Sequence, residues 1–322
     1  MTHRVLLLVF PEFQLLDATG PADVFAAVDE HLPAVARPAY QLQAVSWDGG
    51  MVASSSGLSI DTRPVPEPHD LAGCTLLVAG GYGVQRALQQ GQIARWLEEA
   101  GSLAARCASV CTGAFLLAQS GLMTGRKMVT HWRYAELLQR LYPAVEVLHD
   151  SLFIRDDTFY SSAGVTAGMD LCLSLVEEDH GRDVSLQVAR GLVMYLRRPG
   201  GQRQFSAELL AQQAPAGGVM QGLLSELRRS LVTPWDVESM ATYMNMSPRT
   251  LHRHCQAELE VTPARLLLHL RLEHACQLLE AGQASLKRVA QSSGFGNAYN
   301  LRQAFSRALG VTPWEYRQRF CR

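Results

Sequence analysis

The last hundred residues of the chain contain an internal repeat, which restricts them to a small set of helical folds. The stretch from Ala241 to Val261-Thr262-Pro263 recurs 49 to 50 residues later, from Ala290 to Val311-Thr312-Pro313. Two copies are too few for a solenoid, which needs about three or more. Apolar residues recur at helical spacing, and each copy reads as a helix, a short turn and a second helix. We therefore expect an all-α region with two helix-turn-helix units, at about 237–258 and 286–308.

Start signals for the expected helices recur along this region. Thr233-Pro234 predicts a helix start, with Asp236 well placed for the helix dipole, and Ser247-Pro248 repeats the pattern. The helix between the two copies would fix their spacing, so that both units can enter successive major grooves about 34 Å apart. The predicted helices are Val237–Tyr243, Pro248–Ala257, Pro263–Leu279, Leu286–Ser292 and Ala298–Ala308.

The second helix of each unit carries side chains of the kinds that read DNA. Arginine pairs with guanine edges, whereas asparagine and glutamine pair with adenine. Leu251, Leu301 and Phe305 are expected to face inward. A helical bundle with solvated arginines is the alternative. The candidate DNA-binding residues are Ser247, Arg249, Thr250, His252 and Arg253 in the first unit, and Asn297, Asn300, Arg302 and Gln303 in the second.

The distribution of charge favours DNA binding over the plain bundle. Residues 1–220 carry 16 Lys+Arg against 22 Asp+Glu, whereas residues 221–322 carry 13 against 8. An acidic larger part joined to a tail of net charge +5 indicates that the tail meets a polyanion.

The tail resembles the AraC/XylS family of bacterial transcription regulators over about 221–320. Cys255 and Leu301 stand where the family commonly has aromatic residues, and both keep the position apolar. The resemblance implies a double-stranded DNA operator as partner and RNA polymerase as a further candidate partner, and it favours activation. It is strongest over Val289-Ala290, Gly294-Phe295, Phe305, Leu309-Gly310-Val311-Thr312-Pro313 and Tyr316-Arg317.

The first 180 residues alternate short apolar runs with helical patterns. Such alternation indicates βαβ units, so we expect an α/β fold with a doubly wound, mostly parallel, flavodoxin-like sheet covered on both faces. The predicted strands are Val5–Phe10, Leu42–Ser46, Leu76–Ala79 and Arg106–Val110, and the predicted helices lie near Asp23–Asp29, Ala94–Ala100, Gly113–Ser120 and Ala135–Leu141.

Segments rich in glycine and proline mark the boundary between the two parts. After two further predicted helices, Met169–Glu178 and Val184–Leu196, the pattern breaks at Arg197–Gly201 and again at Gln212–Gly218. We therefore expect an α/β domain at 1–198, a linker at 199–220 and a helical DNA-binding domain at 221–322.

Cys111 stands where a predicted strand ends and a predicted helix begins. The small residues in Ala108-Ser109-Val110-Cys111-Thr112-Gly113-Ala114 are typical of a nucleophile elbow, whose turn is strained. A thiol at a helix amino terminus meets a positive partial charge, which lowers its pKa and favours the thiolate. His131 and Asp17 are its candidate partners, and Gly80-Gly81 could bring backbone N–H groups to a bound anion or carbonyl. A buried Cys and a buried His, each in the core, are the alternative.

Residues 1–185 resemble the class I glutamine amidotransferase-like, PfpI-type superfamily. Cys111 matches its elbow cysteine, His131 its dyad position and Asp17 the acidic residue near the cysteine. With Ser162–Asp170 and Gly200-Gly201-Gln202, the resemblance extends to the GlxA-type subgroup of AraC regulators. It implies a non-catalytic sensor derived from an enzyme fold, in regulators associated with catabolism of small nitrogenous metabolites such as amino acids and quaternary amines. Asp17 stands where enzymatic relatives generally carry Glu, which further favours the sensor.

We expect a small metabolite to bind at the carboxyl ends of the parallel strands, where such sheets bind ligands. An aromatic face at Trp132 would suit a cation such as a quaternary amine. No metal is expected, because His252 and His254 point in different directions on a helix. No cofactor is expected either, because Gly80-Gly81-Tyr82-Gly83 lacks the spacing of a dinucleotide fingerprint. The ligand-pocket candidates are Asp17, Gly80, Gly81, Cys111, Thr112, His131 and Trp132.

The sequence therefore predicts a homodimeric DNA-binding transcriptional regulator controlled by a small-molecule effector in the α/β domain. Two alternatives stay open. A cysteine-dependent hydrolase or glyoxalase-like enzyme needs Cys111 and His131 within hydrogen-bond reach, and a redox sensor needs an exposed Cys111 of low pKa. The apolar runs are far shorter than the roughly 20 residues that span a bilayer, and no signal-peptide pattern is present. We accordingly expect a cytoplasmic protein without a membrane partner, whose seven cysteines are thiols.

Overall fold

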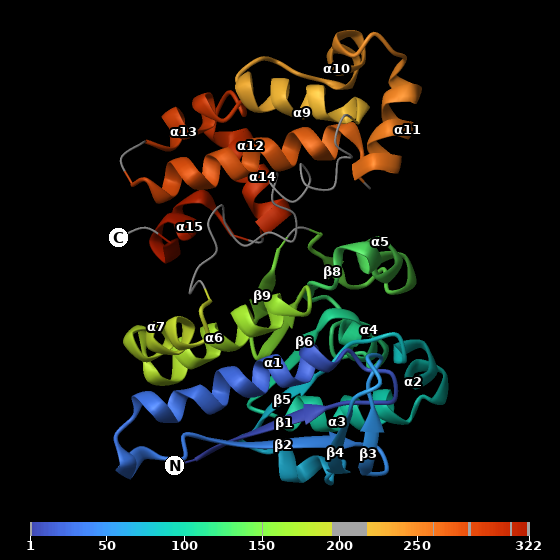
Figure 1. Cartoon of the computed structure of the whole chain (residues 1–322), viewed down its shortest axis with the longest axis vertical. Coiled ribbons are helices and arrows are strands. Elements are labelled where there is room, and N and C mark those ends of the chain that lie inside the picture. Colours follow the sequence, from blue (N-terminus) through green and yellow to red (C-terminus); the bar gives the residue numbers. More distant parts are fainter. Residues whose placement is uncertain are drawn as a thin grey trace. The chain divides into compact units, whose positions relative to one another are not determined.

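The chain forms two compact units, Met1–Leu196 and Arg197–Arg322, in a computed structural model (Figure 1). The structure describes residues 2–149, 151–194, 218–259, 261–282, 285–309 and 311–320. Most of the expected linker at 199–220, with Gly200-Gly201-Gln202, lies outside these residues. Within them, no helix combines the length and the apolar character that crossing a bilayer requires.

The first unit is built on an eight-stranded sheet in the order β3-β4-β2-β1-β5-β6-β10-β9. Neighbouring strands from β4 to β10 pair in parallel, whereas β3 and β9 pair antiparallel at the two edges. A separate parallel pair is formed by β7 (Lys127–Met128) and β8 (Glu146–Val147). The strands of the large sheet are β1 (His3–Leu8), β2 (Tyr40–Ser46), β3 (Gly50–Ala53), β4 (Ser59–Pro64), β5 (Thr75–Val78), β6 (Arg106–Val110), β9 (Phe153–Asp156) and β10 (Phe159–Ser162).

Two groups of helices accompany the sheet. Helix α6 packs against both α1 and α7, whereas α2, α3 and α4 pack on one another. Short 3-10 turns cover Ala27–His31, Ala34–Ala36, Pro68–Leu71 and Cys111–Gly113. The α-helices of this unit are α1 (Leu15–Ala26), α2 (Val84–Gln90), α3 (Gln92–Leu103), α4 (Ala114–Gln119), α5 (Trp132–Leu141), α6 (Thr166–His180) and α7 (Arg182–Gly191).

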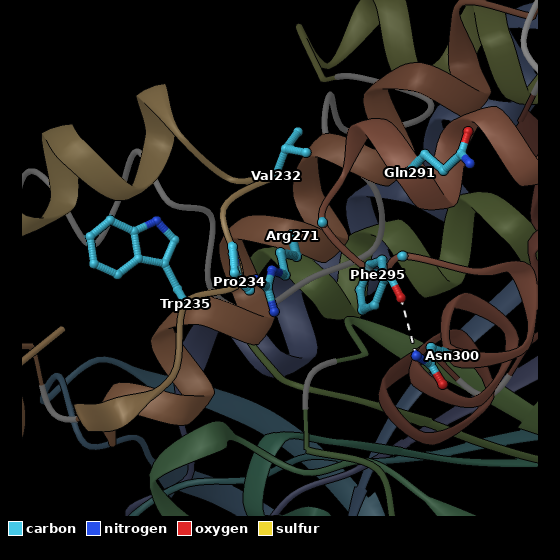
Figure 2. Close-up of a pocket in the computed structure, with 9 residues that line it drawn as sticks. Val232, Pro234, Trp235, Arg271, Gln291, Phe295 and Asn300 are labelled. Atoms are coloured by element: carbon cyan, nitrogen blue, oxygen red, sulfur yellow. Dashed lines mark hydrogen bonds between the residues drawn. The ribbon is translucent and has the colours of Figure 1, made fainter. Parts of the chain in front are cut away.

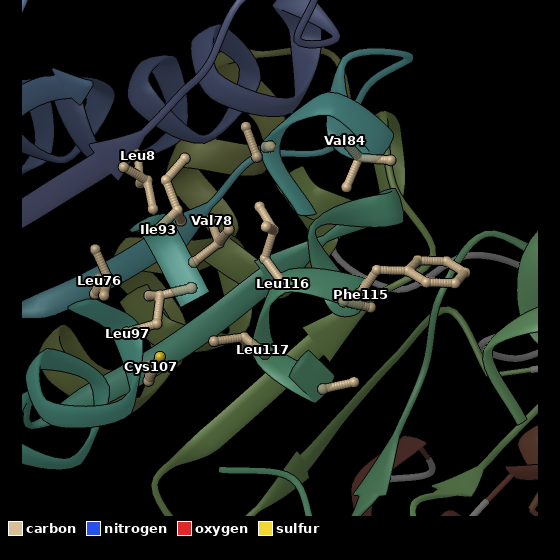
Figure 3. Packing of buried hydrophobic residues seen from close by; sticks show 14 of the residues in the cluster. Leu8, Leu76, Val78, Val84, Ile93, Leu97, Cys107, Phe115, Leu116 and Leu117 are labelled. Atoms are coloured by element: carbon tan, nitrogen blue, oxygen red, sulfur yellow. The ribbon is translucent and has the colours of Figure 1, made fainter. Parts of the chain in front are cut away.

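Alternate side chains of the central strands enter two separate cores, because successive residues of a strand point to opposite faces. Leu6 and Leu8 of β1 pack with residues of α2, α3 and α4, and Figure 3 shows part of this core around Leu8, Leu97 and Leu116. Val5 and Leu7 pack instead with residues of α1, α6 and α7. Both faces of the parallel sheet are thus covered, as expected for strands that read as continuous apolar runs.

Two predicted helices have different bounds in the structure. The first was expected near Asp23–Asp29, but α1 begins at Leu15 and the chain tightens into a 3-10 turn after Ala26. Gly20 and Pro21 lie inside α1 and obscure its helical pattern in the sequence. The helix expected over Val184–Leu196 already ends at Gly191. Val193, shortly after it, has a positive φ of 55°, and a right-handed helix cannot pass through a residue in that conformation.

The second unit is entirely helical in its described residues and is organised around α12 (Pro263–Glu280), which contacts each of the other six helices. Leu272, Cys276 and Leu279 of α12 form a buried core with α13, α14 and α15. Cys255 and Leu301, the two departures from the family pattern, are both fully buried. The other helices are α9 (Val219–Arg229), α10 (Val237–Tyr243), α11 (Pro248–Leu259), α13 (Leu286–Ser292), α14 (Ala298–Leu309) and α15 (Pro313–Phe320).

The prediction that a helix starts at Thr233-Pro234 is wrong. Helix α10 begins at Val237, and its N-cap is Asp236, whose carboxylate accepts the N–H of Ser239 at 2.7 Å. The Ser239 hydroxyl in turn accepts the N–H of Asp236 at 2.8 Å. This reciprocal capping box satisfies two backbone donors at once. Asp236, which was expected only to interact with the helix dipole, therefore sets the start of the helix.

Candidate functional site

Cys111 lies in a strained turn directly after β6, with a positive φ of 55°. The chain continues through the 3-10 turn Cys111–Gly113 into α4, which is the strand-to-helix geometry expected for the elbow. Gly80 and Gly164 lie directly against this residue. A Cβ atom added to Gly80 would lie 2.8 Å from the Cys111 Cβ, and one added to Gly164 would lie 2.4 Å from it. The turn therefore requires glycine at both neighbouring positions.

Asp17 of α1 joins this turn to two other segments through its carboxylate. Its Oδ2 accepts the N–H of Gly80 at 3.1 Å, and its Oδ1 accepts the N–H of Val165 at 2.8 Å. The side chain of Cys111 lies close enough for each of the two groups to influence the pKa of the other. The carboxylate is 1% exposed, so it holds the ends of β5, β6 and β10 together in a site closed to water.

Burial shifts the pKa values of both acidic groups upwards. The pKa of Asp17 rises to about 6, because desolvation outweighs the stabilising hydrogen bonds from Val165 and Gly80. The pKa of the Cys111 thiol also rises above its usual range, first through burial and then through the neighbouring Asp17. The expected lowering of the thiol pKa by a helix amino terminus is therefore wrong, since desolvation exceeds the partial charge of a single short turn.

Thr112 and Thr130 fix the backbone around the cysteine. The Thr112 hydroxyl accepts the N–H of Gly81 at 2.9 Å and donates to the Gly81 carbonyl at 3.2 Å. The Thr130 hydroxyl donates to the Cys111 carbonyl at 2.9 Å. The Gly80 N–H is thus bonded to Asp17 and the Gly81 N–H to Thr112. Neither donor is directed at the position of a bound oxyanion.

His131 is not the hydrogen-bond partner of Cys111 within the described part of the chain. It is the N-cap of α5, and its Nδ1 accepts the N–H of Arg133 at 3.3 Å. Burial and the Arg133 charge lower its pKa. The ring lies 5.4 Å from Trp132 and 6.0 Å from Tyr134, measured between centroids. The structure therefore brings Asp17, Gly80, Gly81 and Thr112 to Cys111, and places His131 in an aromatic group beside Trp132.

We expect the Cys111 thiol to react slowly with alkylating reagents, because a buried thiol with a raised pKa holds little thiolate. In the folded chain at about pH 7.5, labelling by iodoacetamide should be at least ~10-fold slower than in the urea-unfolded chain. Peptide mass spectrometry identifies Cys111 among the other thiols. Equal rates in the two states would contradict the closed, protonated site and support a redox role.

The first helix-turn-helix unit comprises α10 and α11. The Ser247 hydroxyl lies 2.9 Å from the Thr250 hydroxyl and accepts the Thr250 N–H at 3.2 Å, so these residues start α11. Arg249, His252 and Arg253 are exposed on this helix, while Leu251 is fully buried. The helix thus turns its apolar side inward and its basic side to solvent.

The second helix-turn-helix unit comprises α13 and α14. Some of its polar residues bond within the preceding turn, and others are exposed along the helix. The Asn297 Oδ1 accepts the N–H of Asn300 at 2.9 Å, and the Asn300 Nδ2 donates to the Phe295 carbonyl at 3.1 Å. Both amides therefore shape the turn before α14. Arg302 is exposed further along the helix, and like Arg249 and Arg253 it forms no salt bridge with any residue that the structure describes.

Arg271 of α12 lies where the two helix-turn-helix units meet. Its guanidinium donates to the Leu231 carbonyl at 3.4 Å and to the Thr233 carbonyl at 3.0 Å. Gly294, in the turn of the second unit, has a φ of +79°, and a Cβ there would lie 2.1 Å from the Leu231 oxygen. The segment before α10 and the turn before α14 therefore meet at one point on α12.

A cavity of about 520 Å³ lies along this junction. Figure 2 shows Pro234 and Trp235 on one side, Phe295 and Asn300 on the other, and Arg271 between them. Arg271 was not predicted as a site residue, because its helix was expected only to set the spacing of the two repeats. Gly164 and Val165 were not predicted either, although both lie in Ser162–Asp170, which carries part of the family resemblance. The cavity is lined by Val232, Pro234, Trp235, Arg271, Gln291, Gly294, Phe295, Gly296 and Asn300.

Comparisons with known families match both units. Residues 3–178 match the DJ-1/PfpI family, and residues 240–319 match a helix-turn-helix domain. The chain is 30% identical to the HTH-type transcriptional regulator GbdR of Pseudomonas aeruginosa, over 88% of this chain and 76% of that protein. It is also 33% identical to an isonitrile hydratase of Pseudomonas putida, over 58% of this chain and 75% of that protein.

The fold of the first unit recurs among solved structures. An AraC family transcriptional regulator from Pseudomonas putida superposes with a TM-score of 0.53 and 22% identity, covering 59% of this chain and 99% of that one. At this identity the likeness concerns the fold alone.

Proposed function

The chain belongs to the DJ-1/PfpI family and joins that domain to an AraC-type helix-turn-helix domain, and on this basis we propose that it is a sequence-specific DNA-binding transcriptional regulator controlled by a small metabolite. The observation that carries the proposal is the pair of helix-turn-helix units that both contact α12, each with exposed arginines on its second helix that form no salt bridge with the described residues.

Exposed arginines that have no acidic partner among the described residues suit contact with DNA. Arg249, Arg253 and Arg302 lie on helices whose opposite sides are buried in the unit's core. A guanidinium can pair with a phosphate or with a guanine edge without first losing an internal ion pair. Contacts to phosphate would position the protein, and contacts to bases would supply its specificity.

The first unit is the proposed sensor, with the metabolite near Cys111. The Arg133 guanidinium lies 5.3 Å from the centre of the Trp132 ring, so one cation already occupies an aromatic face there. A purely cationic ligand would have to compete with Arg133 for Trp132. A zwitterion such as an amino acid fits this position better, since its carboxylate can approach Arg133 while its ammonium group meets an aromatic ring.

Control by the metabolite is proposed to act through a homodimer. A ligand that binds one arrangement of the two subunits more tightly shifts the population towards it and changes how both tails fit their half-sites. Activation through RNA polymerase would follow when the favoured arrangement binds DNA. Native mass spectrometry of the full chain after exposure to a cell metabolite extract tests the sensor, and a retained, unmodified small molecule is the expected result.

Replacing Arg302 by alanine should weaken operator binding by about 1–3 kcal/mol if the guanidinium reads a base. The side chain is exposed and pairs with no acidic residue in the described part of the chain, so the fold should be unaffected. Fluorescence anisotropy with operator duplexes measures the change, and Arg229→Ala, which removes an exposed arginine of α9 paired with Glu226, is the matched control. Unchanged binding by a folded Arg302→Ala variant would remove this residue from the interface.

A cysteine-dependent enzyme is the second candidate, because part of the chain is similar to an isonitrile hydratase. The non-catalytic proposal rests on the raised pKa of Cys111 and on His131, which is bonded elsewhere. Incubation with an isonitrile distinguishes the two. Turnover that Cys111→Ala abolishes would establish the enzyme, whereas stoichiometric binding without turnover supports the sensor.

A further inference from the structure

Tyr299 is an exposed aromatic residue in the first turn of the second recognition helix, α14. Its side chain is 69% exposed. The neighbouring Leu301 and Phe305 are fully buried. Tyr299 therefore lies on the solvent side of α14, near the end of the helix that enters the groove in helix-turn-helix proteins.

Tyr299 is bonded to a residue of the kind that reads adenine. The Gln303 Nε2 donates to the Tyr299 hydroxyl at 3.0 Å. The two residues are four apart on one helix, so their side chains lie on the same side. By contrast, Asn297 and Asn300 already direct their amides to the backbone of the preceding turn. Gln303 is thus the side-chain amide of α14 that forms no bond to this turn, and it remains available to contact a base.

The bond to Tyr299 determines which atoms of Gln303 remain available. A glutamine amide has two N–H donors and one carbonyl acceptor. One donor is used on the Tyr299 hydroxyl, which leaves one N–H and the Oε1. Adenine presents an acceptor, N7, beside a donor, the N6 amino group, in the major groove, and one donor with one acceptor is the matching pair. Guanine presents two acceptors there, so its O6 would face the Gln303 carbonyl.

We propose that Tyr299 is a positioning residue that holds the Gln303 side chain in place for contact with a base, and that the pair gives the second helix-turn-helix unit a preference for adenine over guanine at one operator position. This inference rests on the proposed function of DNA binding. Without the tyrosine hydroxyl the Gln303 side chain loses this hydrogen bond, and more of its conformational freedom must then be lost on binding DNA.

Base-by-base affinity measurements test the proposal. The full-length protein selects an operator from a library of random duplex DNA, and every base pair of that operator is then replaced in turn. For Tyr299→Phe, we expect the preference for adenine over guanine to fall about fivefold at a single position, in line with the loss of one hydrogen bond. Preferences at the other positions should change less than about twofold, because phosphate contacts carry no sequence information.

Two further variants make the result specific. Tyr243→Phe is the matched control, since Tyr243 is also exposed, at 46%, but lies on α10 rather than on a recognition helix; its profile should equal that of the wild type. Gln303→Ala should lose the preference at the same position, and adding Tyr299→Phe to it should change nothing more, because the two residues act as one unit.

The outcomes separate this proposal from the one on which it depends. A wild-type protein that selects no sequence from the library would overturn the proposed function. A wild-type protein that selects an operator, together with a Tyr299→Phe profile equal to its own, would overturn the role of Tyr299 while leaving the DNA-binding function intact. Additive effects of Tyr299→Phe and Gln303→Ala would show two independent contacts and would also overturn the positioning role.

Discussion

Replacing Gly294 by alanine should destabilise the helical unit Arg197–Arg322 by about 3 kcal/mol or more. The loss combines overpacking with the strain of a left-handed backbone at a residue that has a Cβ. The new Cβ would lie 2.1 Å from the Leu231 carbonyl oxygen and 2.7 Å from the Arg271 Nε. The contact with the Leu231 oxygen cannot be relieved by rotating a side chain, because that atom belongs to the backbone. Relief requires the segment before α10 to move away from the turn before α14, which changes the spacing of the two helix-turn-helix units.

A second glycine in the same turn provides the control. Gly296 has a φ of +75°, close to the +79° of Gly294, but a Cβ there would meet nothing within 4 Å. Gly296→Ala therefore carries only the backbone strain, about 1–2 kcal/mol. Urea unfolding monitored by hydrogen exchange of α12 peptides gives both stabilities. Anisotropy with a full operator and with a single half-site should show that Gly294→Ala loses affinity mainly for the full operator. Equal behaviour of the two variants would contradict the role of the junction.

The folds of both units were predictable because their patterns are local. Continuous apolar runs identified the central strands of the parallel sheet, and β6 was predicted with its bounds, Arg106–Val110. The repeat identified α10 and α13 with their bounds in the same way. The strands β3, β4, β9 and β10 of the large sheet and the short β7 and β8 were not predicted. They are mostly brief, and exposed or polar residues interrupt any continuous apolar run in them. The family comparisons confirm the fold class and the two-part resemblance.

The chemistry at Cys111 was less predictable, because it depends on contacts between distant segments. Nothing in the sequence near Cys111 shows that Gly164, far along the chain, closes over the thiol, or that Val165 donates to Asp17. Burial therefore reversed the expected direction of the thiol pKa. Similarly, the amides of Asn297 and Asn300 were suitable readers by type, but the turn before α14 uses both of them. Residue type gave the candidates, and only three-dimensional contacts distinguish the occupied side chains from the available ones.

Asp17 should make the first unit less stable as the pH rises from about 4 to about 6. Its pKa is about 6 in the folded chain against 3.8 in the unperturbed state, so the folded form holds the proton more tightly than the unfolded form does. The stabilisation is complete below the unfolded pKa and is lost as the pH rises through the folded pKa. At 1.36 kcal/mol for each pKa unit, the loss amounts to about 3 kcal/mol.

Comparing the wild type with Asp17→Asn isolates this contribution, because every other titrating group is common to both. Hydrogen exchange of β6 peptides in urea, at several values between about pH 4 and pH 7, gives the stability of the first unit. The wild type should lose about 3 kcal/mol relative to the variant over this range. Asp61→Asn, an exposed carboxyl on β4, should keep the wild-type dependence. Parallel curves for the wild type and Asp17→Asn would show that Asp17 titrates normally. That result would also remove the closed site as the cause of the raised Cys111 pKa, because the same burial acts on both groups.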